Sequence, residues 1–171
     1  MLRNSLAIGV IAAGISIVLG RSAWAGDDID PGALAKALSG ASITLDQGLK
    51  ASEQEGQPIS GKYELEDGAL QLSVYAMKGD KFTEVIVDHK AGSIKKAEPI
   101  TDADDLKDAK EQGEAMGKAK LSLAKAVGDA VAVNSGYRAV SAVPALNGGQ
   151  PEATITLLKG DEIKKVTEKL N

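Results

Sequence analysis

The sequence has 171 residues and no cysteine, and its aromatic side chains are one tryptophan, three tyrosines and one phenylalanine. The lack of cysteine excludes disulfides, thiolate metal ligands and thiol nucleophiles. Because aromatic rings are few, leucine, isoleucine, valine and alanine must supply most of the apolar area that folding buries. We therefore expect a small core that packing and hydrogen bonds hold together without covalent cross-links.

Histidine is almost absent too: the single one, His89, lies in the stretch VIVDHKAGSI, between Asp88 and Lys90. An imidazole beside a carboxylate can be half of a catalytic pair, because it titrates near neutral pH. A triad also requires a nucleophile, and a histidine metal site requires a second histidine or a thiolate at ligand spacing. The sequence has no such second ligand and no GxSxG nucleophile motif. We expect no catalytic residues, no metal and no cofactor, and so a protein that is not an enzyme.

The first 25 residues have the pattern of a secretory signal peptide. Arg3 gives a positive start, residues 6–19 (LAIGVIAAGISIVL) are apolar and uncharged, and Ala23 and Ala25 are small residues where a signal peptidase reads the chain. This run is shorter than the roughly twenty residues that a transmembrane helix needs. We expect cleavage after Ala25, a periplasmic or secreted protein, and no stable membrane insertion after cleavage. Retention of the segment as an anchor is the alternative.

Charge narrows the range of partners. Acidic side chains outnumber basic ones by 24 to 20, and by 24 to 18 without the first 25 residues, which hold Arg3 and Arg21. An acidic balance disfavours nucleic acid, because binding to a phosphate backbone requires positive charge. Pairs of carboxylates suffice for glycosidase chemistry, but nothing in the sequence suggests a concave site for a sugar.

Local patterns predict a helix followed by an antiparallel meander. Residues 26–42 mix glycine, aspartate and proline around one short helical run with Leu34 and Leu38 on one face, which we interpret as a flexible lead-in. From residue 43 we predict a helix of about three turns, capped by Thr44. Four strand signals follow, KYELE, ALQLSVYAM, FTEVIVD and SIKKAEPI, separated by turns that contain DG, KGD and KAG. The alternation of apolar and polar residues in ALQLSVYAM indicates an antiparallel strand with one wet face.

The same plan recurs in the second half of the chain. ITLDQGL (residues 43–49) matches LSLAKAV (121–127) at an offset of 78, and SVYAMKGDKF (73–82) matches TITLLKGDEI (154–163) at an offset of 81. Ser122 can cap the second helix as Thr44 caps the first. We interpret the match as an internal duplication and place the change of offset in the loop PALNGGQP, where insertion costs least. Coincidental turn chemistry is the alternative.

Residues 101–120 (TDADDLKDAKEQGEAMGKAK) separate the two copies. Acidic residues begin this segment and lysines end it, and both charges complement a helix dipole. Its apolar stripe is thin. We predict a mostly solvated acidic connecting helix that can continue into a helix over residues 121–134, and a site for a basic partner is the alternative.

Residues 43–100 contain, in order, the capped helix, a strand, DG, an alternating strand and a pattern V-x-V-D-x-x-x-G-x-I made by Val85, Val87, Asp88, Gly92 and Ile94. This arrangement resembles the PepSY domain family. Residues 121–171 are similar through their helix and first strands, but their last segment, EIKKVTEKLN, lacks the aspartate and glycine of the closing turn. The second copy therefore resembles a degenerate PepSY unit.

The patterns and the resemblance together predict an α+β fold: tandem small units, each a helix packed on an antiparallel β-meander. The expected division is a signal peptide (1–25), a flexible lead-in (26–42), a first unit (43–100), an acidic connecting helix (101–120) and a degenerate second unit (121–171). In the closing turn of the first unit, we expect Asp88 to accept backbone N–H bonds, Gly92 to take a positive φ and His89 to point to solvent.

The resemblance implies a module of secreted and cell-envelope proteins that occurs in propeptides of secreted peptidases and is proposed to restrain peptidases, with no catalytic residue set. We therefore expect a non-catalytic binding module that meets another envelope or secreted protein, a peptidase being one candidate, through sheet edges or the helix-free sheet face. A structural or sensory accessory of a cell-envelope complex, or a binder of a small ligand, is the alternative.

Overall fold

The computed structural model describes residues 30–171. The predicted signal peptide, its cleavage site and Trp24 lie outside the described residues. The described chain forms, in order, α1 (Pro31–Leu38), α2 (Leu45–Ser52), β1 (Gln57–Glu66), β2 (Ala69–Lys78), β3 (Lys81–Val87), β4 (Ile94–Pro99), α3 (Ala103–Lys118), α4 (Leu123–Ala132), β5 (Arg138–Asn147), β6 (Gln150–Lys159) and β7 (Glu162–Lys169).

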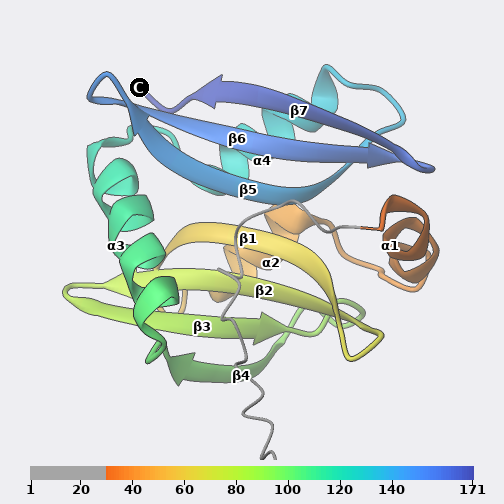
Figure 1. Cartoon of the computed structure of the whole chain (residues 1–171), viewed down its shortest axis with the longest axis horizontal. Helices are drawn as coiled ribbons and strands as arrows, with labels where there is room; N and C mark the ends of the chain where they lie inside the picture. Colours follow the sequence, from red (N-terminus) through yellow and green to blue (C-terminus); the bar gives the residue numbers. More distant parts are fainter. Residues whose placement is uncertain (1–29) are drawn as a thin grey trace, which may run out of the picture.

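All the strands join in one antiparallel sheet with the order β4-β3-β2-β1-β5-β6-β7 (Figure 1). Each half of the chain contributes a meander. The two meanders meet at the centre, where Gly61 pairs with Ala142 and Lys62 with Ser141. The predicted α+β class, with a helix on an antiparallel meander in each unit, is confirmed. The two units share a single continuous sheet.

The helices lie on both faces of this sheet (Figure 1). α2 and α4 cover one face, here called the helix face, and α3 crosses the other, here called the open face. The approach of α2 is close: a Cβ added to Gly61 would lie 2.9 Å from Leu49 Cδ2, and one added to Gly48 would lie 2.4 Å from Leu72 Cδ2. Both positions therefore require glycine if α2 is to keep its distance from β1 and β2.

The core lies between the helix face and the helices α2 and α4. It is mostly aliphatic, as the scarcity of aromatic residues predicts, and Tyr63 is buried in it. Tyr75, the other buried aromatic side chain among the described residues, lies on the open face with Ser73. Side chains that are 0% or 1% exposed come from every layer of the core: Leu45, Leu49, Leu72, Val74, Val85, Leu123, Val127, Ile155 and Leu157.

α1 corrects the expectation of a flexible lead-in over residues 26–42. The short helical run is present, and its Leu34 and Leu38 are only 1% and 3% exposed. Asp30 caps the helix by accepting the Ala33 N–H at 3.0 Å, and Pro31 is its first residue. The interpretation as a loose segment is wrong for residues 31–38, because the aspartate and proline that suggested a loop start a helix instead.

The other helices differ from the predictions in length and burial. α2 has only eight residues, although the predicted cap is confirmed: the Thr44 N–H donates to Gln47 Oε1 at 2.9 Å. α3 ends at Lys118 and does not continue into α4, since residues 119–122 intervene. The second half of α3 is also less solvated than predicted, because Ala109, Gln112, Gly113, Ala115 and Met116 are buried.

The strands of the two halves repeat their geometry at a constant offset of 81 residues. The two-residue turns Gly79-Asp80 and Gly160-Asp161 begin with φ values of 61° and 60°, a conformation that glycine adopts without strain. β1 has a bulge between Pro58 and Ser60, and β5 has one between Ala139 and Ser141. This structural repeat follows the predicted sequence repeat.

The three extra residues of the second half lie elsewhere than predicted. α4 has ten residues where α2 has eight. The connection to the next strand covers residues 133–137 in the second half and residues 53–56 in the first. PALNGGQP is instead the β5–β6 hairpin, whose two-residue Gly148-Gly149 turn matches Asp67-Gly68. The prediction failed because a hairpin register leaves no room for insertion, whereas a helix end and a turn do.

Candidate functional site

The turn after β3 contains the residues that the sequence singled out. Asp88 Oδ1 accepts the backbone N–H groups of Lys90 at 2.8 Å and Ala91 at 3.0 Å, and Gly92 has a φ of 73°. These bonds stabilise the charged carboxylate and lower the pKa of Asp88 to about 2, with Lys95 adding a smaller favourable interaction. The structural role predicted for Asp88 and Gly92 is confirmed.

His89 does not point fully to solvent, which corrects the prediction. Its side chain is half-buried, and its Nδ1 atom is buried without a hydrogen-bond partner. Burial lowers the pKa of the imidazole, and the positive charge of Lys95 lowers it further. The sequence holds no second histidine and no cysteine to accompany it.

The backbone of His89 has a clear structural function. Its carbonyl oxygen accepts the N–H groups of Ser42 at 2.9 Å and Ile43 at 3.2 Å. In the second half, Leu170 occupies the equivalent position, and its carbonyl accepts the N–H groups of Lys120 at 2.6 Å and Leu121 at 3.0 Å. The same pair of backbone hydrogen bonds thus fixes the loop before α2 and the loop before α4. Leu170 is 0% exposed, so a position that holds an apolar side chain in one unit holds the imidazole in the other.

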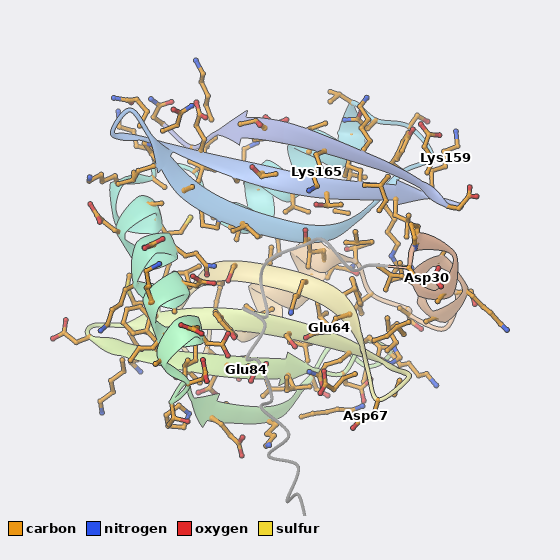
Figure 2. All side chains as sticks on the ribbon, viewed as in Figure 1. Asp30, Glu64, Asp67, Glu84, Lys159 and Lys165 are labelled. Atoms are coloured by element: carbon orange, nitrogen blue, oxygen red, sulfur yellow. The ribbon has the colours of Figure 1, made fainter. Side chains whose placement is uncertain are left out.

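The open face carries a polar row across the middle of the sheet. Ser73, Lys62, Ser141, Thr156 and Lys165 pair in succession from β2 to β7. Figure 2 shows Glu64, Glu84 and Lys165 among the side chains of this face.

Glu64, beside the row on the open face, accepts contacts from two of its members. The Lys62 ammonium lies 2.5 Å from Glu64 Oε2, and the Ser73 hydroxyl donates to Glu64 Oε1 at 2.7 Å. Nearby, the Ser60 hydroxyl donates to Gln112 Oε1 of α3 at 2.6 Å. Burial raises the pKa of Glu84, and the negative charges of Glu64 and Asp105 raise it further. This arrangement holds α3 against the sheet and offers no activated nucleophile.

The outer edge of β7 presents unpaired backbone groups. In the two-residue β6–β7 hairpin, Lys159 and Glu162 flank the turn as a hydrogen-bonded pair, and the bonding direction alternates from there. The N–H and C=O groups of Ile163, Lys165, Thr167 and Lys169 therefore point away from β6. The bond from the Leu170 N–H to the Pro151 carbonyl, 2.9 Å long, fits this alternation.

In the first unit, the equivalent outward backbone groups of β3 are hydrogen-bonded to a fourth strand, β4. Phe82 and Asp88 lie 81 residues before Ile163 and Lys169. The Phe82 carbonyl accepts the Ile100 N–H at 3.0 Å, and the Asp88 N–H donates to the Ser93 carbonyl at 2.8 Å. β4 thus covers β3, whereas in residues 30–171 no strand covers β7.

The opposite edge of the sheet is less suited to pairing. β4 has six residues and contains a register shift opposite Ile86 and Val87. Its last residue is Pro99, which has no N–H to donate. β7 has eight residues, no proline and an uninterrupted register with β6. Of the two edges, β7 is the better template for another strand.

Other kinds of site find little support in the described part of the chain. It contains no group of three or more histidine, aspartate or glutamate side chains placed to hold a metal ion. None of its helices is long and apolar enough to cross a membrane. Comparisons with protein-family models, with curated proteins and with solved structures found no match.

The sequence analysis singled out the segment that forms β7. It gave no indication of a second candidate site, a pocket of about 150 Å³. Residues from the end of α2, the start of β1, the end of α3 and the start of α4 line it. Its walls come from four elements that are far apart in the sequence, so no local pattern could have indicated it.

Proposed function

We propose that this protein is a non-catalytic binding module of the secreted or cell-envelope compartment, and that the outer edge of β7 binds an extended segment of another protein as an added strand. The observation that carries the proposal is the difference between the units: β4 covers β3, but nothing in the described chain covers the equivalent edge of β7. Such edges accept partner strands through backbone hydrogen bonds.

Charge indicates the chemistry of the partner segment. β7 contains three lysines and two glutamates, a net charge of +1: Lys164, Lys165, Lys169, Glu162 and Glu168. Lysines on an edge strand discourage pairing with arbitrary apolar strands. An added strand with carboxylates opposite Lys165 and Lys169 avoids that barrier. The partner segment is therefore extended, with two acidic residues four positions apart, and a peptidase is the partner class that the PepSY resemblance suggests.

A pair of proline variants tests this route. Thr167→Pro removes an N–H that points outward from β7. Ala97→Pro is the matched control, because it removes an N–H that points outward from β4, at the opposite edge of the sheet. The mature protein is used to capture partners from envelope extract. We expect Thr167→Pro to lose the specific partner, and Ala97→Pro and His89→Ala to retain it.

Two results would refute the proposal. One is equal capture by all variants, which would exclude the β7 edge. The other is turnover of a substrate that His89→Ala abolishes, which would show catalysis.

A further inference from the structure

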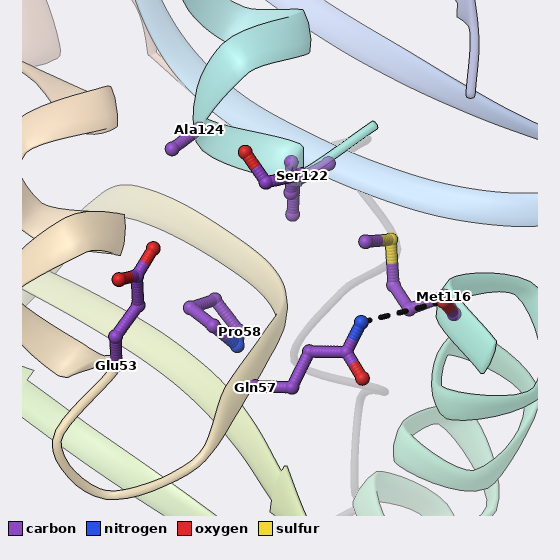
Figure 3. A pocket seen from close by; sticks show the side chains of 7 residues that line it. Glu53, Gln57, Pro58, Met116, Ser122 and Ala124 are labelled. Carbon is purple, nitrogen blue, oxygen red and sulfur yellow. Dashed lines mark hydrogen bonds between the residues drawn. The ribbon is translucent and has the colours of Figure 1, made fainter. Parts of the chain in front are cut away.

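The pocket between the two units has mostly apolar walls and a polar rim (Figure 3). Met116, Leu123 and Ala124 are buried in its walls, and Glu53, Gln57 and Ser122 are exposed. It is lined by Glu53, Gln57, Pro58, Met116, Ser122, Leu123 and Ala124. Its volume of about 150 Å³ suits one side chain rather than a cofactor.

The internal repeat supplies an occupied counterpart of this pocket. Gln57 and Arg138 are the first residues of β1 and β5, 81 residues apart. Gln57 Nε2 donates to the Met116 carbonyl near the end of α3 at 3.3 Å. Arg138 Nη1 donates to the Leu38 carbonyl at the end of α1 at 3.0 Å. Each strand thus begins with a side chain that donates to the last turn of a helix outside its own meander, α3 for Gln57 and α1 for Arg138.

The surroundings of the two positions also correspond. Arg138 Nη2 donates to the Ile43 carbonyl, and Ile43 directly precedes the cap of α2. Leu121 precedes the cap of α4, Ser122, which lines the pocket. The same pair of backbone bonds, to His89 or to Leu170, fixes both loops. In the first unit, therefore, a guanidinium group fills the place that remains open in the second.

The pocket has the chemistry to hold the same group. The guanidinium of Arg138 lies over Tyr63, 5.4 Å from the ring centroid, with its donors on two carbonyl oxygens. The Met116 carbonyl lies at a helix C-terminus, which favours positive charge, and already accepts the Ala119 N–H and Gln57 Nε2, so a bound guanidinium would take the place of the Gln57 amide on it. The carboxylate of Glu53 lies at the rim of the pocket. Pro58, Met116 and Leu123 provide apolar surface for the methylene groups of an arginine.

We propose that this pocket binds the guanidinium group of an arginine side chain presented by another polypeptide. Glu53 at the rim favours an arginine within a chain over free arginine, because the α-carboxylate of the free amino acid would lie near a second negative charge. The inference does not depend on strand addition at β7, since none of the residues involved belongs to that edge.

A titration of the mature protein with N-acetyl-arginine amide tests the proposal by NMR, with the Gln57 side-chain amide and the Met116 methyl group as reporters. We expect saturable shifts at both, weaker shifts with free arginine, and none with N-acetyl-lysine amide, which cannot make the planar, paired contacts of a guanidinium. Glu53→Gln should weaken binding about two- to fivefold, the range for an exposed ion pair. Glu55→Gln is the matched control, because Glu55 is nearby but does not line the pocket.

A second variant tests the pocket without a ligand. Gln57→Arg introduces the residue of the equivalent position, so we expect it to fill the pocket, abolish binding of N-acetyl-arginine amide and raise the Tm by about 2 to 4 °C. Gln57→Met supplies a long apolar side chain without the guanidinium and should not raise the Tm as much. Equal binding of the arginine and lysine amides, or persistent arginine binding in Gln57→Arg, would overturn the assignment.

Discussion

Asp88 illustrates how a single carboxylate organises the local chain. Its side chain accepts two N–H groups of the following turn, while its own N–H donates to the Ser93 carbonyl as the chain returns toward β4. Lys169 stands at the equivalent position in the second half. A lysine can only donate hydrogen bonds. The second unit therefore lacks the side chain that stabilises this turn in the first.

The bonds to Asp88 predict a specific acid titration. Its folded pKa of about 2 lies below the ordinary 3.8, so the carboxylate contributes stability that is present above the ordinary pKa and lost as the pH falls through about 2. Carbon-13 NMR of the carboxyl group should show this midpoint. Asp88→Asn keeps an acceptor oxygen but cannot titrate, and should remove this part of the acid sensitivity. A midpoint near 4 for Asp88 would contradict the hydrogen-bonded turn.

The surroundings of His89 predict how its replacement by an apolar side chain changes stability. Its Nδ1 is buried without a partner, and the equivalent residue is the fully buried Leu170. A depressed histidine pKa means stability that is present above the unfolded pKa of about 6.5 and lost as the pH falls through the folded pKa. We expect His89→Leu to be at least as stable as the parent at pH 7 and to lose less stability than the parent between pH 7 and pH 5. Urea titrations at both pH values measure this, and a strongly destabilised His89→Leu would show that the imidazole makes a required contact.

At the scale of elements, the sequence predicted what local patterns determine. The DG and KGD turns and the cap at Thr44 depend on neighbouring residues, and all are present. The wet face predicted for β2 is wrong, because residues 72–76 are buried on both faces of the sheet and α3 lies over part of the open face. The docking of α1 was missed because its two leucines reveal nothing about the surface they contact. The burial of Gln112 and Gly113 in α3 was missed for the same reason: Gln112 is buried through its bond to Ser60, and Gly113 because Met77 and Phe82 lie against it.

Of the two candidate sites, the sequence indicates part of the β7 edge and nothing of the pocket. The charged segment of β7 is visible in the sequence, and so is Lys169 at the position that corresponds to Asp88. That β7 is an outermost strand also depends on the pairing of β1 with β5, which rests on two residue pairs without a sequence signal. The pocket requires four elements to assemble and could not have been predicted.

The first residues of α2 and α4 test whether the two units have equivalent cores. Leu45 and Leu123 are each 1% exposed. Replacing either with alanine removes apolar burial and leaves a cavity, so each should lower the free energy of unfolding by about 2 to 5 kcal/mol. Leu65→Ala is the control, because Leu65 is 37% exposed and should change stability by less than about 1 kcal/mol. A large loss at Leu45 with none at Leu123 would argue against equivalent helices.

At the scale of the whole molecule, the two halves contact each other at several places besides the shared core. β1 pairs with β5, Arg138 of the second half caps α1 of the first, and Gln57 of the first caps α3, which precedes the second. α1 and α3 therefore each depend on the opposite unit. The repeat forms one body with a shared sheet and a shared core.

The predicted signal peptide has a simple spectroscopic consequence. Trp24 is the only tryptophan and lies before the expected cleavage after Ala25. Protein purified from the periplasm should begin at Gly26 and emit only as tyrosine, which mass spectrometry and fluorescence can check. Intact Met1 on a membrane-bound form would favour an anchored protein instead.

The contacts between the two halves predict a single cooperative unfolding transition. Because mature protein is expected to lack tryptophan, Phe82→Trp and Tyr137→Trp would each place one probe, in the first and the second half respectively. Both positions are partly buried and already aromatic, so the substitutions are conservative. In urea, the two probes should report the same midpoint. Adding Arg138→Ala to each should lower both midpoints together, because the loss of the α1 cap destabilises a structure that the halves share. Separate midpoints, or a shift confined to one probe, would mean that the halves unfold as independent domains.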